Sequence, residues 1–332
     1  MTASRRESHR ATRWVAVAFL ARSGGQPQTM DAKSLFEWRD VLFEYVGFLS
    51  SFGVFGAIGF RYGVLRSGVP TSASAGASSP SGPFSMSLKD AAGVGLLGVG
   101  LGVVALLASL LKRASSKHQT IGDALSTGGA PAVAQVVLLA ALLVAFGLAW
   151  RRVSIGWPIA IAAGIAFALR NLLAGRLAGM VNPLHVLGAS LWLGTLFVLV
   201  VCGIGQMLRT SVPAAERERA VAEMVHRFST VGLASASLLG ITGLITGWTH
   251  LRPFSALWTT PYGYALIGKL CVVAAVVMLG AWNWRRVGPS LGKEGGARTI
   301  RRSASTELAF AALVLLITAI LVSLPSPKLP GH

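Results

Sequence analysis

The sequence has few charged residues and little acidic charge. Asp, Glu, Lys and Arg make up 13% of its 332 residues, against roughly 25% in an ordinary soluble domain. This shortage excludes a soluble multi-domain protein. Cysteine is also scarce. Cys202 and Cys271 both lie in apolar stretches, so they supply neither an extracellular disulfide framework nor a CxxC zinc or redox motif, and they are expected to pack as small hydrophobic residues.

Motifs of hydrolytic and phosphoryl-transfer chemistry are missing. The chain contains no GxxxxGK[ST] phosphate loop, no HExxH and no GxSxG, which are the short signatures that such enzymes carry. An ATP-driven pump needs a large soluble nucleotide domain, but no segment between apolar stretches exceeds about 30 residues. We therefore expect no enzyme and no organic cofactor, and any transport must be passive, coupled to an ion gradient or assisted by another protein.

Long apolar stretches are what the sequence does contain. Hydrophobic residues make up 53% of the chain, and about half of the chain lies in stretches near the roughly 20 residues that one helical crossing of a bilayer needs. The fold class predicted is all-α: a polytopic membrane protein, a helical bundle of about eight transmembrane helices. The predicted spans are 41–60, 91–111, 131–150, 153–169, 184–208, 228–249, 262–284 and 308–324.

The net charge of +18 predicts an orientation rather than nucleic-acid binding. Only one basic residue, Lys269, lies inside a predicted span, and the others lie in tails and loops. The four connections that share one side carry fifteen Lys or Arg, while the connections and C-terminal tail on the other side carry seven. Residues 1–40 would add seven more basic side chains to that second side, which disagrees with this orientation unless residues 1–29 are set aside. The more basic side should be cytoplasmic. We therefore expect a multi-pass protein of the bacterial inner membrane, with both termini in the periplasm and loop 285–307 in the cytoplasm.

The chain divides into five parts by composition. Residues 1–36 form an N-terminal tail with two interpretations: either Met30 is the true start, or the basic residues before the apolar octet 14–21 form a weak signal-like segment. A first transmembrane helix follows in 37–66. Residues 67–88 are rich in Ser, Gly, Ala and Pro and are expected to be a flexible linker. Transmembrane helices 2–4 fill 89–181, and helices 5–8 fill 182–327.

Two histidines and a methionine form a candidate metal site on the outer side. His185 opens the fifth span just after Met180, and His250 ends the sixth span at the same face. Consecutive spans joined by a short connection are expected to be adjacent and antiparallel. Imidazole and thioether are suitable copper ligands, and thioether favours Cu(I). The alternative is that each histidine is an interfacial side chain bonded to a neighbour or a headgroup.

Other polar residues in the spans are functional hypotheses because charge is costly in a bilayer. Lys269 either pairs with Glu44, which lies at a similar depth, or snorkels to the outer headgroups. Glu307 lies near the cytoplasmic face, so Lys269 does not reach it easily. Cys271 and Met278, seven residues apart, either extend a path of soft ligands inward or, the favoured alternative, simply pack.

The stretch 182–327 resembles the copper resistance protein D (CopD) family of bacterial inner-membrane proteins. The resemblance rests on the His185–Gly194 motif HVLGASLWLG, on RFS at 227–229 and on TTPYG at 259–263 followed by Lys269. It continues with RRS at 301–303, Glu307 and a closing LPSP. His185, Trp192, Lys269 and Glu307 stand at motif positions, whereas His250 and Met180 were added from the topology. The resemblance implies an eight-span protein that handles copper.

The function predicted from these residues is copper transport or copper tolerance at the inner membrane. The partners implied are membrane lipid and a small periplasmic copper-binding protein of the CopC type, with no nucleic acid. A second interpretation is a membrane electron carrier in which His185 and His250 ligate haem axially. A third is a non-transporting subunit that delivers metal or assists the assembly of another membrane complex.

Overall fold

Helices make up every regular element in the part of the chain that the computed structural model describes, which is residues 38–65, 83–170, 181–250, 255–286, 293 and 295–323. These residues belong to one unit that starts at Trp38. The elements are α2 (Trp38–Gly59), η2 (Phe60–Val64), α3 (Pro83–Lys117), α4 (Ile121–Thr127), α5 (Gly129–Trp150), α6 (Gly156–Leu169), α7 (Val181–Ala189), η5 (Ser190–Gly194), α8 (Thr195–Val198), η6 (Leu199–Ile204), α9 (Gly205–Arg209), α10 (Ala214–His250), α11 (Ala256–Thr259), α12 (Pro261–Arg286) and α13 (Gly296–Ser323).

Seven helices of the described chain are long and apolar enough to cross a membrane. This confirms the all-α polytopic membrane fold. The segments η5, α8, η6 and α9 continue α7 as one spanning helix, Val181–Arg209. The remaining predicted span, 153–169, corresponds to α6, which has only 14 residues. At 1.5 Å per residue α6 is about 21 Å long, shorter than the roughly 30 Å hydrocarbon core.

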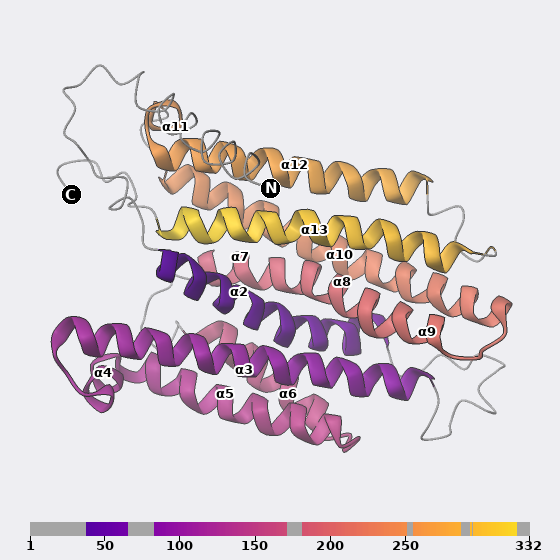
Figure 1. Cartoon of the computed structure of the whole chain (residues 1–332), viewed down its shortest axis with the longest axis horizontal. Coiled ribbons are helices and arrows are strands. Elements are labelled where there is room, and N and C mark those ends of the chain that lie inside the picture. Colours follow the sequence, from indigo (N-terminus) through magenta and orange to yellow (C-terminus); the bar gives the residue numbers. More distant parts are fainter. Residues whose placement is uncertain are drawn as a thin grey trace, which may run out of the picture. The chain divides into compact units, whose positions relative to one another are not determined.

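The long helices lie side by side and alternate in direction (Figure 1). The start of α2 and the end of α13 lie at the same end of this bundle, and the last turns of α5, α9 and α12 lie at the other end. The end that holds the start of α2 is called the outer end below, and the opposite end is called the basic end. α5 and α6 form a hairpin whose turn contains Arg152 with a positive φ of 64°. The described chain thus alternates seven helices of membrane-spanning length with the shorter α6.

Several helices begin earlier than the hydropathy of the sequence predicts. α3 begins at Pro83, inside the expected linker 67–88, and proline is well suited to the first position of a helix. α10 begins at Ala214, inside the expected loop 209–227, and is 37 residues long. Glu, Arg and Ala, which fill the first turns of α10, are strong helix formers whether or not lipid surrounds them. The rest of the linker and residues 1–37 lie outside the described residues.

α2 packs at the centre of the bundle, against α3 and η5 in particular. Glycine allows both approaches. A Cβ built on Gly53 would lie 2.8 Å from Cα of Gly98 on α3, and one built on Gly56 would lie 2.5 Å from the carbonyl carbon of Gly194 in η5. Small residues let helix backbones touch in lipid, where apolar association gains nothing from water. α2 therefore packs within the bundle, although the expected linker 67–88 separates it from the other helices along the sequence.

Three π-helical segments interrupt the long helices: η2 near the end of α2, and η5 and η6 within the helix Val181–Arg209. A π segment adds a residue to a turn and widens the helix there, and such segments are frequent at functional sites. η5 covers Ser190–Gly194, which is the second half of the motif that begins at His185. The most irregular spanning helix is therefore the one that carries the leading candidate ligand.

Candidate functional site

His185 lies on α7 with its imidazole against α10. Its Nδ1 is 3.1 Å from Oγ1 of Thr242, and a Cβ built on Gly243 would lie 3.2 Å from Cε1 of the same ring. Gly188, near one turn further along α7, also approaches α10 closely, since a Cβ there would lie 3.2 Å from the carbonyl oxygen of Ser235. The two helices are thus neighbours, as expected for consecutive spans, and His185 is partly buried between them.

The contact with Thr242 is compatible with one tautomer of His185 in particular. Oγ1 of Thr242 lies 2.7 Å from the carbonyl oxygen of Leu238, to which its hydroxyl donates. In the tautomer that satisfies both contacts, Nδ1–H of the imidazole donates to Oγ1 of Thr242 and Nε2 carries the lone pair. Metal-binding histidines are held in this way, with one nitrogen bonded to a neighbour and the other presented to the ion.

Lys269 lies on α12. It is partly buried, and its charge acts on the imidazole of His185. α7 and α10 therefore bring a histidine and a threonine into contact near the outer end, and α12 carries a cation whose charge that histidine experiences. The name outer site is used below for His185, Thr242, Gly243 and Lys269.

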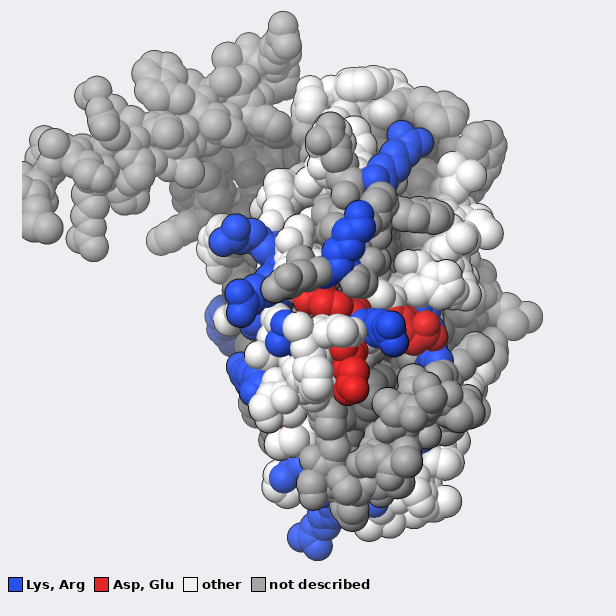
Figure 2. All heavy atoms as spheres, turned by 90° about the vertical axis from the view of Figure 1, so that its right-hand side faces the viewer, with Lys and Arg blue, Asp and Glu red and all other residues white. Residues whose placement is uncertain are grey.

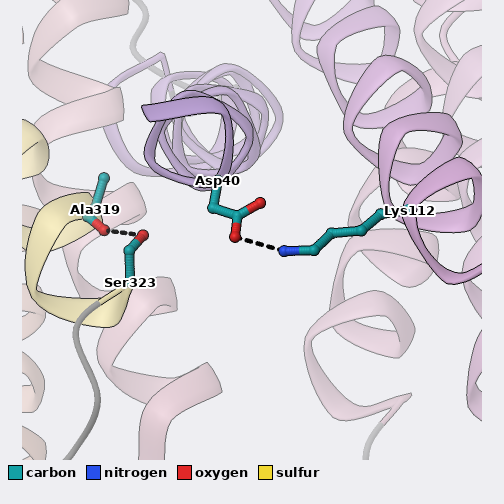
Figure 3. Close-up of polar contacts among 4 residues, drawn as sticks. All are labelled: Asp40, Lys112, Ala319 and Ser323. Carbon is teal, nitrogen blue, oxygen red and sulfur yellow. Dashed lines mark hydrogen bonds and ion pairs between the residues drawn. The ribbon is translucent and has the colours of Figure 1, made fainter. Parts of the chain in front are cut away.

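Glu44 is not the partner of Lys269. The charges that act on Glu44 are those of Asp40 and Lys112, and the ion pairs formed among the described residues do not include Lys269. Asp40 and Lys112 themselves pair at 2.5 Å and tie the start of α2 to the end of α3 (Figure 3). Glu44 is exposed, one turn beyond Asp40. The predicted Lys269–Glu44 ion pair is therefore not formed among the described residues.

Trp192 lies in η5, beside α10. A Cβ built on Gly232 would lie 3.7 Å from Cδ1 of its indole ring. The neighbouring Ser190 is fully buried, and its hydroxyl donates to the carbonyl oxygen of Val186 at 2.7 Å. Thr195, directly after η5, is also fully buried, and its hydroxyl has no hydrogen-bond partner. Trp192, Ser190 and Thr195 therefore lie on the same spanning helix as His185, further toward the basic end. The two hydroxyl groups are buried within the helical bundle.

Glu307 lies on α13 and faces α12. A Cβ built on Gly280 would lie 4.0 Å from its Oε2, and Gly280 is close to the end of α12 that leads to the basic end. Lys269 and Gly280 are eleven residues apart on α12, which is about 16 Å along the helix axis. The structure therefore separates Glu307 from the outer site, in agreement with the depth argument from the sequence.

The remaining predicted ligands divide into two cases. Met180 and the side chain of His250 lie outside the described residues, although α10 itself extends to His250. Cys271 and Met278 are exposed on α12, so the two of them face away from the interior and line no inward path. Within the described residues, no group of three or more His, Cys, Asp or Glu side chains converges as a metal cluster.

Sequence reasoning missed two features of the interior. Gly243 makes room for the imidazole ring of His185. Asp90, directly before the predicted span 91–111, accepts a hydrogen bond from Nε2 of Gln206 and thereby joins α3 to α9. The sequence did contain a signal for this bond. Gln206 lies within the predicted span 184–208 and Asp90 directly precedes the span 91–111, and polar side chains at such positions need hydrogen-bond partners in lipid.

Comparisons with known proteins point to copper. Residues 222–321 match the family model described as Copper resistance protein D, and this range includes Thr242, Gly243, Lys269 and Glu307 but not His185. The chain is also 30% identical over 153 residues to "Copper transport protein CutJ" of Bacillus subtilis (strain 168). That match spans 46% of this chain and 26% of the relative's length. No solved structure matches the chain significantly. The family resemblance noted in the sequence is thus confirmed.

Proposed function

Because the region 222–321 places this chain in the copper resistance protein D family, we propose that the protein moves copper ions through the bacterial cytoplasmic membrane and that His185 holds the ion near the outer end. The family is one of copper resistance and transport rather than a family of enzymes. The ion is cargo here, so the site must bind it weakly enough to release it. A site with few ligands, as seen among the described residues, fits that requirement.

The contact between Nδ1 of His185 and Oγ1 of Thr242, across two spanning helices, is the single observation that carries the proposal. An imidazole held through Nδ1 in this way keeps Nε2 for a metal ion. Imidazole accepts copper in either common oxidation state. The ring lies partly buried between two membrane helices. Burial of a polar side chain there is costly, so an imidazole at this position indicates a functional role.

His250 and Met180 complete the outer route in this proposal. His250 stands eight residues beyond Thr242 on α10, about 12 Å further along the axis. His185 is thus the deeper position, and His250 with Met180 are placed at the mouth. Imidazole and thioether ligands at the mouth would attract copper from the periplasm, and His185 would take it into the bundle.

The orientation follows from charge. Figure 2 shows the basic end of the bundle, where Lys and Arg side chains surround a smaller group of Asp and Glu. Arginines at this end include Arg151, Arg209 and Arg301, from three different connections or helix starts. We assign this end to the cytoplasm because basic residues accumulate on that side of membrane proteins. The outer site then faces the periplasm, where a small copper-binding protein of the CopC type is the proposed donor.

The test is cellular copper content at fixed external copper, with and without the gene and with variants. We expect the gene to change copper content, and the sign of the change gives the direction of transport. His185→Ala and His250→Ala should each remove most of that change. The double variant should reduce the gene-dependent change in copper content little more than the stronger single variant does. The reason is that residues on one route do not contribute additively.

His118→Ala is the matched control, since His118 is exposed and lies in a connection at the outer end. It should behave as the natural protein. Equal copper content with and without the gene would refute copper transport. Normal transport by His185→Ala, in cells that contain the variant at the normal level, would remove the outer site from the mechanism. Visible spectra of the purified protein test the haem interpretation, because haem ligated by two histidines gives a strong Soret band.

A further inference from the structure

A groove on the flank of α13 contains three arginines. It has a volume of about 720 Å³ and is lined by Arg298, Arg301, Arg302, Ser305, Thr306 and Ala309 of α13 together with Leu208 of α9. The arginines come first along α13, and Ala309 follows them about 10 Å or more further along the axis. The lining therefore combines three guanidinium groups with two apolar side chains. A matching ligand needs an anionic group at one end and an apolar part at the other.

The three arginines share one face of α13. They are spaced i, i+3 and i+4, which places their side chains on adjacent turns of the same face. All three are exposed. None of the ion pairs between described residues involves them. Three guanidinium groups in a row, without compensation from those acidic side chains, create a local positive potential that a bound anion would neutralise.

The hydroxyl groups in the groove do not compete with the arginines as donors. Ser305 donates to the carbonyl oxygen of Arg301 at 2.8 Å, and Thr306 donates to that of Arg302 at 3.2 Å. A backbone N–H at the start of α13 is also already bonded, because that of Ala297 donates to Oε2 of Glu218 at 2.8 Å. The hydrogen-bond donors available in the groove are therefore the guanidinium groups, whose planar forks suit the oxygens of phosphate.

The groove crosses the boundary where α13 enters the membrane. Its basic residues precede the apolar stretch 308–324, and Ala309 lies just inside that stretch. A simple accumulation of cytoplasmic arginines would orient the protein but would need no groove and no apolar wall beside it. Basic pockets between membrane helices at this level are typical binding places for anionic lipid headgroups.

We propose that this groove binds the phosphate headgroup of an anionic glycerophospholipid, such as phosphatidylglycerol, with its acyl chain along Leu208 and Ala309. The ligand comes from the membrane and bridges Leu208 of α9 and the arginines of α13. The site is independent of copper, since it lies at the opposite end of the bundle from the outer site. It would exist whichever direction copper moves.

Native mass spectrometry of the detergent-purified protein tests the proposal, with phosphatidylglycerol and phosphatidylcholine as probes. We expect the natural protein to prefer phosphatidylglycerol by roughly a hundredfold, because each of the three arginines contributes roughly 1 kcal/mol to anionic-lipid binding. The variant R298Q/R301Q/R302Q should lose this preference. The matched control R151Q/R152Q/R219Q removes three exposed arginines from the same end but outside the groove, and it should keep the preference.

Three outcomes would overturn the proposal. The groove variant could retain the preference, the control could lose it to the same extent, or inorganic phosphate at millimolar concentration could abolish phosphatidylglycerol binding, which would indicate a site for a free anion. If R298Q/R301Q/R302Q does not fold, R301Q and R302Q are tested singly, and each should reduce the preference. The charge-preserving variant R298K/R301K/R302K should keep part of it.

Discussion

Gly56 of α2 and Gly194 of η5 meet backbone to backbone at the centre of the bundle. A Cβ on Gly56 would lie 2.5 Å from the carbonyl oxygen of Gly194, and a Cβ on Gly194 would lie 2.4 Å from the carbonyl oxygen of Phe52. These atoms belong to the main chain and have little freedom to move aside. The contact joins the first spanning helix to the motif that carries His185 and Trp192.

Gly194→Ala should therefore destabilise the protein. Forcing an extra methyl group into a packed contact costs typically 1–3 kcal/mol, and we expect a lower midpoint of thermal unfolding in detergent. Gly147→Ala is the control, because nothing lies within 4 Å of a Cβ at that helix position. That change should be neutral or slightly stabilising. An unchanged midpoint for Gly194→Ala would show that η5 can shift away from α2.

Thr242→Val should lower copper transport without altering the fold. Valine has nearly the shape of threonine but cannot accept the hydrogen from Nδ1 of His185, so the ring is no longer held with Nε2 free. Loss of such an orienting partner typically costs 10–100-fold in metal affinity or activity. Thr242→Ser should retain most transport, because it keeps the hydroxyl.

Thr318→Val provides the matched control for Thr242→Val. The Thr318 hydroxyl donates to the carbonyl oxygen of Val314 within its own helix at 2.7 Å, as that of Thr242 does to Leu238. Both changes remove a hydroxyl from a spanning helix, but only Thr242 also contacts the imidazole. Equal transport rates for the two valine variants would count against the orienting role.

Lys269→Met should reduce net copper transport while increasing the copper that remains bound to the purified protein. The ammonium acts on the His185 imidazole, and a positive charge there repels a bound copper ion and favours its release. Methionine keeps most of the apolar stem and removes the charge. Glu44→Gln should neither imitate this effect nor correct it, because Glu44 interacts with Asp40 and Lys112 instead. Recovery of transport in the double variant would restore the Lys269–Glu44 hypothesis.

The orientation is tested by reporter fusions. A reporter active only in the periplasm should give signal when fused after the end of α13 and none when placed in the connection between α12 and α13. The reason is the excess of Lys and Arg at the basic end. The reverse pattern would place the outer site in the cytoplasm and exclude a periplasmic copper donor.

The sequence by itself determined the class of the protein and the existence of its spanning helices. Long apolar stretches leave few alternatives, because every backbone group in lipid must be bonded within a helix or a closed barrel. The family motif, the adjacency of the helices that carry His185 and Thr242, and the separation of Lys269 from Glu307 also followed from order and depth along the chain. Hydropathy did not give the true helix ends, since α3 and α10 continue through polar residues that favour helix.

Only the tertiary structure decided which side chains meet. Residues on different helices are brought together by rotation and close packing, which one-dimensional spacing does not encode. The charge of Lys269 therefore acts on His185, whereas Glu44 experiences the charges of Asp40 and Lys112. Gly243 makes room for the imidazole ring, and Asp90 accepts a hydrogen bond from Gln206, 116 positions away. The orientation of His185 depends on a contact with Thr242 on another helix, so it belongs to the fold and not to the motif.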